Sequence, residues 1–466
     1  MGCLCATLMN DQQKTITRRN TYSLNAECTD VYYKSFTGYR KFKSEYKIQP
    51  KPIGLGSLGK VYLCNQITTN KLFAVKVISK AGLSTEYLKN NVIENQVKII
   101  QELNHPSILK IFDFFYDLNN FYIVMEYVKG GDLVDKVTEF GCFTEQVAAN
   151  VMKQIFCSLG YLHNKGIVHR DVKCENILIE ENNKDLIIKL IDFDTISKLN
   201  PGEKLKGWYG TVYYMAPELI SGSYTEKCDI WSAGIVLYSL ITQNFPFGGE
   251  NENIIMRSIK NFKGDKNLMK KHKISNELNH FILCLLNPDP EKRLSAQEAS
   301  SHPWIQKFTT LRVPKTLKQQ IFDQQSNIRQ ALKIWALKTI IPSFELAEYQ
   351  MMFINMDQDL DGLIKIGQLV QGNENEYCEK IVKVFDCCGN QGLNFHEFAS
   401  FLVPGEVIRK YSDQILEELD KDKSGKLSIK HLMMFLEEYV KVDDWSGNED
   451  NNGEITNSEI MNLISV

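Results

Sequence analysis

The sequence predicts an α+β domain followed by an all-α domain, and three observations support that assignment. Short runs rich in β-branched and aromatic residues come first, and long stretches with helical periodicity follow. The last quarter of the chain repeats one acidic loop pattern four times. The two parts also differ in charge, because residues 343–466 hold 24 Asp and Glu against 10 Lys and Arg, whereas the remainder carries a net charge of +11.

The composition is that of a globular protein with several domains. The chain has 466 residues, of which 43% are hydrophobic and 24% charged. No run of 18 apolar residues occurs, the N-terminus lacks the features of a secretory signal, and the 12 cysteines are scattered without a CxxC pair. We therefore expect a cytoplasmic protein with reduced thiols. No basic run interleaved with aromatic residues occurs, so we expect no nucleic-acid partner.

The pattern along the chain suggests four segments. Residues 1–45 are polar and predict a flexible N-terminal arm, 46–304 form the α+β domain, 305–342 a basic junction, and 343–466 the acidic domain. Within the α+β domain we expect strands and helices at Lys60–Cys64, Phe73–Ile78, Phe121–Met125, Thr144–His163 and Lys227–Leu240. In the junction, apolar residues recur at near-helical spacing at Ile328, Leu332, Trp335, Ala336 and Ile340.

A glycine-rich loop near the start of the α+β domain suggests phosphate binding. Gly54, Gly56 and Gly59 precede Val61 in a GxGxxGxV pattern, in which backbone N–H groups can approach phosphate oxygens. Alone this pattern is weak, because many turns are rich in glycine. Lys76 lies on the next expected strand, where an ammonium group can reach phosphates.

An ordered series of motifs further along the chain makes the signal specific. It consists of His169-Arg170-Asp171, Lys173, Asn176, Asp192-Phe193 and Ala216-Pro217-Glu218. Together with the glycine-rich loop and Lys76, this is the signature of protein kinases. It implies that Asp171 accepts the proton of the substrate hydroxyl, that Lys173 neutralises the γ-phosphate, and that Asn176 and Asp192 hold Mg²⁺.

Residues 46–304 resemble a serine/threonine protein kinase of the calmodulin-dependent group, and the chain from about residue 46 resembles the calcium-dependent protein kinases. In that family a two-lobed kinase is joined through an autoinhibitory junction to a calmodulin-like EF-hand module. The resemblance implies MgATP and Ca²⁺ as cofactors, protein substrates, and nucleotide contacts from Glu126 and Val128. It also implies that Asp132 and Glu175 face a basic residue of the substrate, and that Asp229, Arg293 and Trp304 are structural.

Three positions depart from the kinase pattern. The helix glutamate that normally pairs with Lys76 is Gln96, whose amide could still accept a hydrogen bond. The glycine after Asp192-Phe193 is Asp194, which is either a tolerated change or an altered switch at the metal site. The usual activating threonine is Gly207, so activation by phosphorylation at that position is excluded and Arg170 has no phosphate partner there.

The acidic domain contains four degenerate EF-hand loops, which begin 29, 34 and 28 residues apart. The first contains Asp357, Asp359, Asp361, Gly362, Ile364 and Gln368. The second contains Asp386, Cys388, Asn390, Gln391, Leu393 and Glu397. The third contains Asp420, Asp422, Ser424, Gly425, Leu427 and His431. The fourth contains Asn448, Asp450, Asn452, Gly453, Ile455 and Glu459.

The loops are expected to differ in calcium affinity. Loop four keeps the bidentate glutamate at position 12 and is expected to bind best. Loops one and three are expected to bind weakly, through Asp357, Asp359 and Asp361 and through Asp420, Asp422 and Ser424. Loop two lacks an oxygen at position 3 and a glycine at position 6, so we expect an empty structural partner. The alternative is that all four loops are structural and bind no calcium.

The junction and the N-terminus suggest further interactions. A basic helix with an apolar face suits an apolar groove with an acidic rim, so we expect the junction to bind the EF-hand module; the alternative is a solvated helix on the kinase surface. Gly2, Cys3 and Cys5 resemble a dual-acylation signal, although Ala6 departs from the strict pattern. Acylation would anchor the protein at the cytoplasmic face of a membrane. The alternative is an unmodified arm.

The sequence therefore predicts a Ca²⁺-regulated serine/threonine kinase. Two rival hypotheses remain. A pseudokinase that acts as a calcium-responsive scaffold is motivated by Gln96 and Asp194, but Asp171, Lys173, Asn176 and Asp192 argue against it. A constitutive kinase with a structural EF-hand module is the other.

Overall fold

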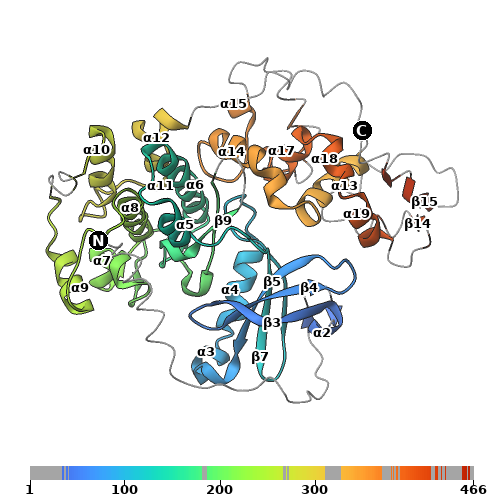
Figure 1. Ribbon diagram of the computed structural model, residues 1–466, viewed down its shortest axis with the longest axis horizontal. Helices are drawn as coiled ribbons and strands as arrows, with labels where there is room; N and C mark the ends of the chain where they lie inside the picture. Colours follow the sequence, from blue (N-terminus) through green and yellow to red (C-terminus); the bar gives the residue numbers. More distant parts are fainter. Residues whose placement is uncertain are drawn as a thin grey trace. The chain divides into compact units, whose positions relative to one another are not determined.

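The computed structural model describes residues 34–35, 38–39, 41–180, 186–265, 269, 272–309, 327–369, 379, 381–382, 385–386, 389–420, 424, 426–428, 432, 436, 454–458 and 460–461. Most described residues up to 309 form one compact unit, and those from 327 onward belong to a second unit. The first unit has a lobe built on a sheet and a lobe built from helices, drawn in blue and in green to yellow in Figure 1.

A five-stranded sheet forms the N-terminal lobe, with strand order β3-β4-β5-β7-β6, and β7 pairs antiparallel with both β5 and β6. The strands are β3 (Tyr46–Leu55), β4 (Lys60–Gln66), β5 (Leu72–Ser79), β6 (Ile111–Tyr116) and β7 (Asn120–Met125). The expected strands are therefore confirmed, because β-branched and aromatic side chains pack well on a pleated surface. The shorter elements of this lobe are β1 (Lys34–Ser35), β2 (Gly38–Tyr39), α2 (Phe42–Glu45), η1 (Lys80–Gly82) and α3 (Thr85–Lys89).

The end of the expected N-terminal arm is part of the folded lobe. Phe42 is buried, and its ring stacks on Tyr46 and Tyr122 with centroids 5.6 and 4.6 Å away. The expectation of a flexible arm up to residue 45 is therefore wrong for 42–45, because an aromatic cluster outweighs their polar neighbours. Most of the rest of the arm lies outside the described residues.

Helix α4 (Val92–Gln101) packs beside the sheet through Ile93 and Val97, which share a core with Ile78 and Phe114. Its polar face carries Gln96 towards the short helix η3 (Phe193–Thr195), which α4 contacts.

The C-terminal lobe is organised around two buried helices, α6 (Glu145–Asn164) and α8 (Lys227–Thr242). Thr144 caps α6 by accepting a hydrogen bond from the N–H of Val147. The remaining elements are α5 (Leu133–Phe140), β8 (Ile167–Val168), η2 (Cys174–Asn176), β9 (Ile177–Glu180), β10 (Ile187–Leu190), β11 (Ser197–Lys198), β12 (Leu205–Lys206), η4 (Val212–Tyr214), α7 (Pro217–Ile220), β13 (Ser223–Tyr224), α9 (Glu252–Asn261), α10 (Asn276–Leu285), α11 (Ala296–Ser300) and α12 (Pro303–Phe308).

The charged and aromatic residues that were expected to be structural hold this lobe together. Arg293 is buried, and its Nη1 lies 2.5 Å from Oε1 of Glu218 in the Ala-Pro-Glu motif. Trp304 is also buried, and its indole N–H donates to Glu145 at the start of α6 over 2.8 Å. Removing one partner of such a buried pair is costly because the other is left without compensation.

The second unit has EF-hand-like loops whose described segments pair at two places. Its elements are α13 (Asn327–Thr339), η6 (Ser343–Leu346), α14 (Ala347–Met356), α15 (Ile366–Leu369), α17 (Phe395–Leu402), α18 (Gly405–Arg409), α19 (Ser412–Leu419), β14 (Lys426–Ser428) and β15 (Glu454–Thr456). A β-bridge joins Ile364 of loop one to Leu393 of loop two. In the second pair β14 and β15 place Leu427 opposite Ile455. The expected pairing of the loops is thus present in both halves.

Helix α13, in the junction, lies in the core of the second unit. Leu332, Trp335 and Ala336 are buried in one cluster with Phe353 and Phe398, and α13 packs on α17. The helical spacing of the junction is therefore confirmed. Lys333 is buried as well, so burial in this basic helix extends beyond its apolar side chains.

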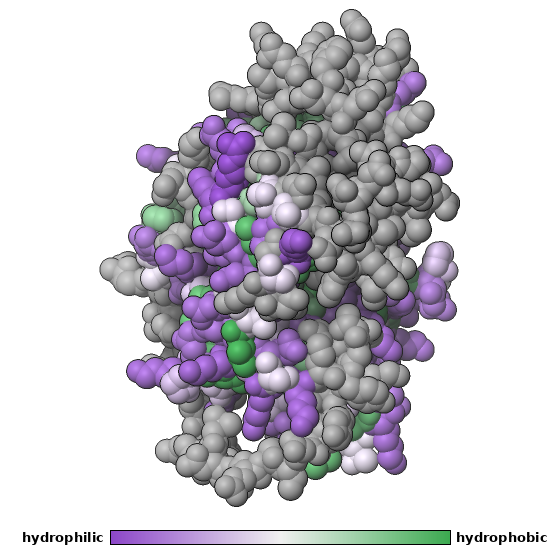
Figure 2. All heavy atoms as spheres, turned by 90° about the vertical axis from the view of Figure 1, so that its right-hand side faces the viewer, coloured by the Kyte–Doolittle hydropathy of each residue, from purple (hydrophilic) through white to green (hydrophobic). Residues whose placement is uncertain are grey.

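The described helices include none that is both long and apolar enough to cross a membrane. On the face drawn in Figure 2 the described side chains are mostly hydrophilic, with apolar ones scattered among them.

Candidate functional site

The glycine-rich loop joins β3 to β4 and is closed by a backbone hydrogen bond. The N–H of Gly56 donates to the carbonyl of Gly59 over 2.8 Å. A Cβ at position 59 would lie 2.3 Å from the carbonyl oxygen of Val77, so only glycine fits there. Gly54 and Val61 lie on the two flanking strands. The loop therefore has the hairpin form that a phosphate-binding loop requires.

Lys76 lies on β5 and points at two carboxylates. Its Nζ is 3.1 Å from Asp192 Oδ1 and 2.5 Å from Asp194 Oδ2. Burial lowers the pKa of Lys76, but the charges of Asp192 and Asp194 outweigh it and the pKa is raised. For Asp192, burial raises the pKa, but the charge of Lys76 outweighs it and the pKa is lowered. Lys76 and Asp192 are therefore both ionised at neutral pH.

Among the hydrogen bonds of the described residues, none joins Gln96 to Lys76, although one was expected. Gln96 is on helix α4, but its Nε2 donates to the main-chain carbonyl of Asp194 over 2.7 Å. Lys76 is paired instead with Asp192 and Asp194, and the sequence analysis did not predict the contact with Asp194. The sequence did contain a signal, since position 96 lacks the usual glutamate and position 194 has an aspartate in place of the usual glycine.

The two residues that were expected to contact the nucleotide, Glu126 and Val128, follow strand β7. The Glu126 carboxylate is 2.9 Å from Nζ of Lys189 on β10 and accepts the N–H of Lys110 over 3.3 Å. The Glu126 side chain therefore holds this segment to the C-terminal lobe, and a contact with the nucleotide would come from its backbone. Val128 is buried two residues later.

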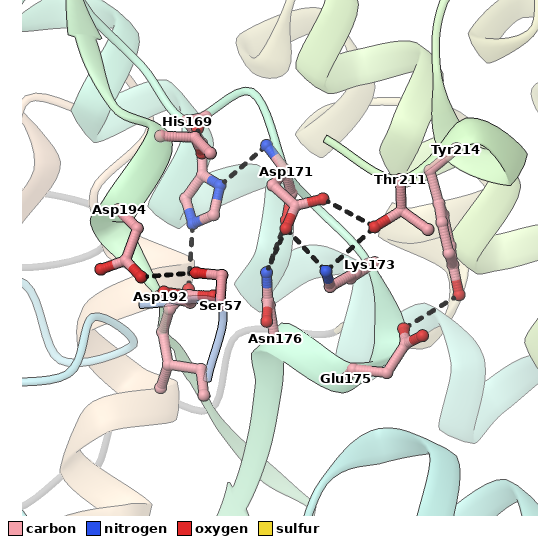
Figure 3. A network of polar contacts seen from close by, with 12 residues as sticks. Ser57, His169, Asp171, Lys173, Glu175, Asn176, Asp192, Asp194, Thr211 and Tyr214 are labelled. Carbon is pink, nitrogen blue, oxygen red and sulfur yellow. Dashed lines mark hydrogen bonds and ion pairs between the residues drawn. The ribbon is translucent and has the colours of Figure 1, made fainter. Parts of the chain in front are cut away.

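The catalytic-loop residues converge on Asp171 (Figure 3). Lys173 Nζ lies 2.7 Å from Asp171 Oδ2, and the Thr211 hydroxyl donates to Asp171 Oδ1 over 3.1 Å. Lys173 also donates to the Thr211 hydroxyl over 3.0 Å. Asn176 donates its amide to the carbonyl and to Oδ2 of Asp171 over 2.8 and 3.1 Å. The predicted catalytic residues thus form one cluster, to which Thr211 is an addition.

A buried aspartate shapes the backbone of this loop. Asp229 accepts the N–H groups of His169 and Arg170 over 2.9 and 2.8 Å, and it lies 3.0 Å from His163 Nε2. Burial raises the pKa of Asp229, but the hydrogen bond and charge of His163 outweigh it and the pKa is lowered. Arg170 has a φ of 71°, a strained conformation for a non-glycine residue. The hydrogen bonds to Asp229 stabilise that conformation.

The two expected magnesium ligands, Asn176 and Asp192, each have an oxygen atom of the kind that Mg²⁺ binds. Asn176 uses its amide nitrogen to hold Asp171, and its carbonyl oxygen points away from Asp171 in Figure 3. Asp192 binds Lys76 through Oδ1 and has a second carboxylate oxygen. Amide and carboxylate oxygens are hard ligands, which Mg²⁺ prefers. These two residues therefore fit the ion.

The activation segment has glycine where a phosphorylated threonine is common in kinases. Gly207 has a φ of 94°, which disfavours any residue with a Cβ. Arg170, which lacks a phosphate partner at that position, contacts the Tyr209 ring instead.

Asp132 and Glu175 form an acidic patch close to Asp171. Burial, together with the charges of Asp135 and Glu175, raises the pKa of Asp132 to about 6, although the hydrogen bond from the Asp135 N–H opposes the shift. Burial also raises the pKa of Glu175, which accepts a hydrogen bond from the Tyr214 hydroxyl over 3.3 Å. Two neighbouring carboxylates with raised pKa values attract a cation, because a positive charge would relieve their repulsion.

Loop one of the second unit brings three predicted ligands together. Ligand oxygens of Asp357, Asp359 and Asp361 all lie within 4.8 Å of one another. Asp357 Oδ1 is buried without a hydrogen-bond partner among the described residues. These donors fit a calcium ion. However, Lys365 Nζ also lies 2.5 Å from Asp361 Oδ2 and contacts Asp359, so the loop contains a cation of its own.

The last position of loop one differs from its expected role. The Gln368 carbonyl oxygen accepts the N–H of Lys365 over 2.8 Å, and its Nε2 donates to Asp359 over 2.9 Å. The oxygen that was expected to face calcium is therefore used to cap a turn.

Loops two and three are described in part. In loop two Asp386 accepts the N–H groups of Asn390 and Gln391, and Gln391 has a φ of 66° where other loops have glycine. In loop three Asp420 accepts the Ser424 N–H over 3.0 Å and the Asn457 amide over 2.9 Å. The remaining predicted residues lie outside the described part of the chain, namely Cys388, Asp422, Gly425, His431, Asn448, Asp450, Asn452, Gly453, Glu459, Gly2, Cys3 and Cys5.

Comparisons with known proteins agree with this geometry. A model of the protein kinase domain matches residues 47–305. The chain is 31% identical to calcium-dependent protein kinase 4 of Plasmodium berghei (strain Anka) over 463 residues, which cover 91% of this chain and 87% of that protein. It is 32% identical to calcium-dependent protein kinase 5 of Plasmodium falciparum (isolate 3D7) over 381 residues, which cover 78% of this chain and 66% of that protein. With the kinase lobes and the paired EF-hand loops in place, the chain belongs to the calcium-dependent protein kinase family.

Proposed function

We propose that this chain is a Ca²⁺-regulated serine/threonine kinase that transfers the γ-phosphoryl group of MgATP to proteins. The observation that carries the proposal is the arrangement at Asp171, where Lys173 and Thr211 contact the two carboxylate oxygens. A carboxylate held in this way is oriented before the substrate arrives, and positioning supplies most of the catalysis in phosphoryl transfer.

The residues divide the reaction between them. The substrate oxygen bonds to the γ-phosphorus while the bond from that phosphorus to the bridging oxygen of ADP breaks, and the hydroxyl proton passes to Asp171. Lys173, whose Nζ lies 2.7 Å from Asp171, neutralises charge on the transferred group. Asn176 and Asp192 would hold Mg²⁺, which supplies further neutralisation of the phosphates when bound.

The acidic patch of Asp132 and Glu175 supports a preference for basic substrates. Both side chains lie next to the catalytic loop, and each carries a raised pKa because of burial and neighbouring carboxylates. A basic residue near the target hydroxyl would pair with this patch, and complementary charge fixes both the register and the rate of association.

Two features of the second unit support regulation by calcium. Loop one gathers three carboxylates, and the junction helix α13 is buried in the same core as the EF-hand helices α14 and α17. A change in loop geometry on calcium binding would therefore alter the surface that holds the junction. The proposal is that calcium biases the junction between a released and an inhibitory position.

Membrane attachment is a separate part of the proposal. Gly2, Cys3 and Cys5 would carry a myristoyl chain and palmitoyl chains, and two lipids give stable anchoring where one does not. A Gly2→Ala variant is expected to move from the membrane fraction to the soluble fraction of cells. Unchanged fractionation would contradict the lipid hypothesis.

Peptide phosphorylation by the purified full chain tests the main proposal. We expect transfer to a serine peptide with upstream arginines in Ca²⁺ and little transfer in chelator, and we expect Asp171→Asn to abolish it. No transfer in either condition would favour a pseudokinase scaffold. Equal transfer in both would indicate a constitutive kinase with a structural EF-hand module.

A further inference from the structure

Lys76 meets two carboxylates, and both belong to the segment that follows β10. Its Nζ lies 2.5 Å from Asp194 Oδ2 and 3.1 Å from Asp192 Oδ1. The Lys76 side chain is 9% exposed and that of Asp194 13%, so water screens their attraction poorly. The kinase pattern has a glutamate at position 96 of α4 and no side chain at position 194. Here the carboxylate stands on η3 instead of α4.

The two unusual residues also contact each other. Gln96 donates its amide to the main-chain carbonyl of Asp194 over 2.7 Å. A carboxylate at position 96 could not donate this hydrogen bond, and it would add a negative charge beside Asp194. A glycine at position 194 would leave Lys76 with Asp192 alone. Asp194 therefore fits a glutamine at position 96 better than the usual glutamate. With Gln96 in place, Lys76 in turn depends on a carboxylate at position 194, which the usual glycine would not provide.

We propose that Asp194 is the positioning residue for Lys76 and takes over the role of the glutamate that α4 lacks. The inference rests on the proposed kinase function, in which Asp192 is needed for Mg²⁺. Lys76 then requires a second carboxylate that stays in place when nucleotide binds, and Asp194 provides it. Gln96 ties the main chain of Asp194 to α4, so the position of α4 still governs the position of Lys76.

Asp194 also reaches the glycine-rich loop. The Ser57 hydroxyl donates to Asp194 Oδ2 over 2.7 Å, and Figure 3 shows Ser57 and Asp194 side by side. The oxygen that pairs with Lys76 thus also holds the tip of the loop above the phosphate site. This contact raises an opposite possibility, in which Asp194 competes with the phosphates for Lys76 and Ser57, and the test must separate the two.

An exchange of the two side chains tests the proposal in the full-length protein. The variants are Gln96→Glu, Asp194→Asn, and the double variant, which has the net charge of the wild type. We expect each single change to lower kcat/KM for a peptide by about tenfold or more, and the double variant to recover to within about threefold of wild type. A residue with a merely structural role would give losses that add in the double variant.

Two further measurements keep the result interpretable. Calorimetry with MgADP measures nucleotide affinity without transferase activity, and we expect the same order of the variants. Asn95→Asp places the same added charge at an exposed position of α4 and is expected to behave as wild type. If Asp194→Asn does not fold, Asp194→Gly and its combination with Gln96→Glu replace it in the cycle.

The outcomes are distinct. Recovery in the double variant supports the exchange, and a double variant no better than the weaker single overturns it. Tighter MgADP binding with faster transfer in Asp194→Asn also overturns it, because the carboxylate would then block the phosphate site. If the wild-type protein binds MgADP but transfers no phosphoryl group, the proposed function is wrong. The MgADP affinities of the variants then still show whether Asp194 positions Lys76.

Discussion

The guanidinium carbon of Arg170 lies 3.8 Å from the centre of the Tyr209 ring. The same guanidinium donates to the Ile196 carbonyl over 3.3 Å and to the Tyr224 hydroxyl over 3.4 Å, and it contacts the Thr195 carbonyl. Arg170 therefore links the catalytic loop to the activation segment through a cation–π contact. In many kinases a phosphate makes this link, and at Gly207 none can be added.

Tyr209→Ala is expected to lower kcat by about two- to fivefold, because a partly exposed cation–π contact is worth about 0.5–1 kcal/mol. Peptide phosphorylation by phosphatase-treated protein measures the change. Tyr209→Phe keeps the ring and is the matched control, so it should retain wild-type activity. An equal loss in both variants would indicate that the hydroxyl, and not the ring, provides the link.

The preference for basic substrates is expected to weaken as the pH falls below about 6. Burial raises the pKa of Asp132 to about 6, so its carboxyl is charged above that pH and neutral below it. A cationic substrate favours the charged form. The KM for an arginine-containing peptide should therefore rise as the pH drops from 7.5 to 5.5, more than the KM for a neutral peptide does.

Asp132→Asn provides the control for this pH dependence. Asp132 caps α5 by accepting the N–H of Asp135 over 2.9 Å, and asparagine caps helices as well as aspartate does. The variant should keep its fold, show a higher KM for the arginine peptide at pH 7.5, and show a smaller additional rise at low pH, with Glu175 left as the titrating carboxylate of the patch. An unchanged KM for the arginine peptide at pH 7.5 would remove Asp132 from substrate recognition.

Loop one is expected to bind calcium more tightly once its internal cation is removed. Lys365 Nζ lies 2.5 Å from Asp361 Oδ2, and the Lys365 side chain is 46% exposed. An exposed ion pair is worth about 0–1 kcal/mol, so Lys365→Gln should raise the affinity by up to about fivefold. Gln368→Glu should add to this effect by restoring the bidentate ligand at position 12.

Calcium titration calorimetry of the full chain measures both changes. Lys410→Gln removes the same charge outside the loop, where Lys410 pairs with Glu345 over 3.4 Å, and is expected to leave the affinity unchanged. Equal gains in Lys365→Gln and Lys410→Gln would mean that overall charge, and not the contact in loop one, sets the affinity.

Local patterns were enough to predict most of the fold and the catalytic cluster. Helices α6 and α8 begin and end within two residues of the expected limits, because burial and capping depend on nearby residues. Asp171, Lys173 and Asn176 lie within one loop, so their convergence follows from the motif. Lys365 is at position 9 of the same loop as its partners, so the local sequence contains this signal as well.

Contacts between distant residues could not be predicted in this way. Lys76 and Asp194 are 118 positions apart, and the sequence alone does not show which carboxylate fills the place opposite a lysine. The hydrogen bond from Gln96 depends on the orientation of an amide that can donate or accept. The burial of Lys333 depends on how the junction helix packs, because a helical pattern predicts the apolar face and not what covers the others.

The boundary between kinase and junction leads to the last prediction. A chain ending after Thr309 is expected to phosphorylate peptides equally in Ca²⁺ and in chelator, because it lacks α13 and the EF-hand loops. The cut must preserve α12. Ile305 of this helix is buried, and its main-chain carbonyl accepts a hydrogen bond from the Thr309 hydroxyl over 3.0 Å. A chain ending at Gln306 loses the last turn of α12 and is expected to melt at a lower temperature. Thermal melting of both fragments checks this difference, and Asp171→Asn in the 309-residue fragment controls for contaminating kinases. A fragment ending after Thr309 that melts normally but transfers nothing would contradict autoinhibition, since it would show that the EF-hand unit is required for activity.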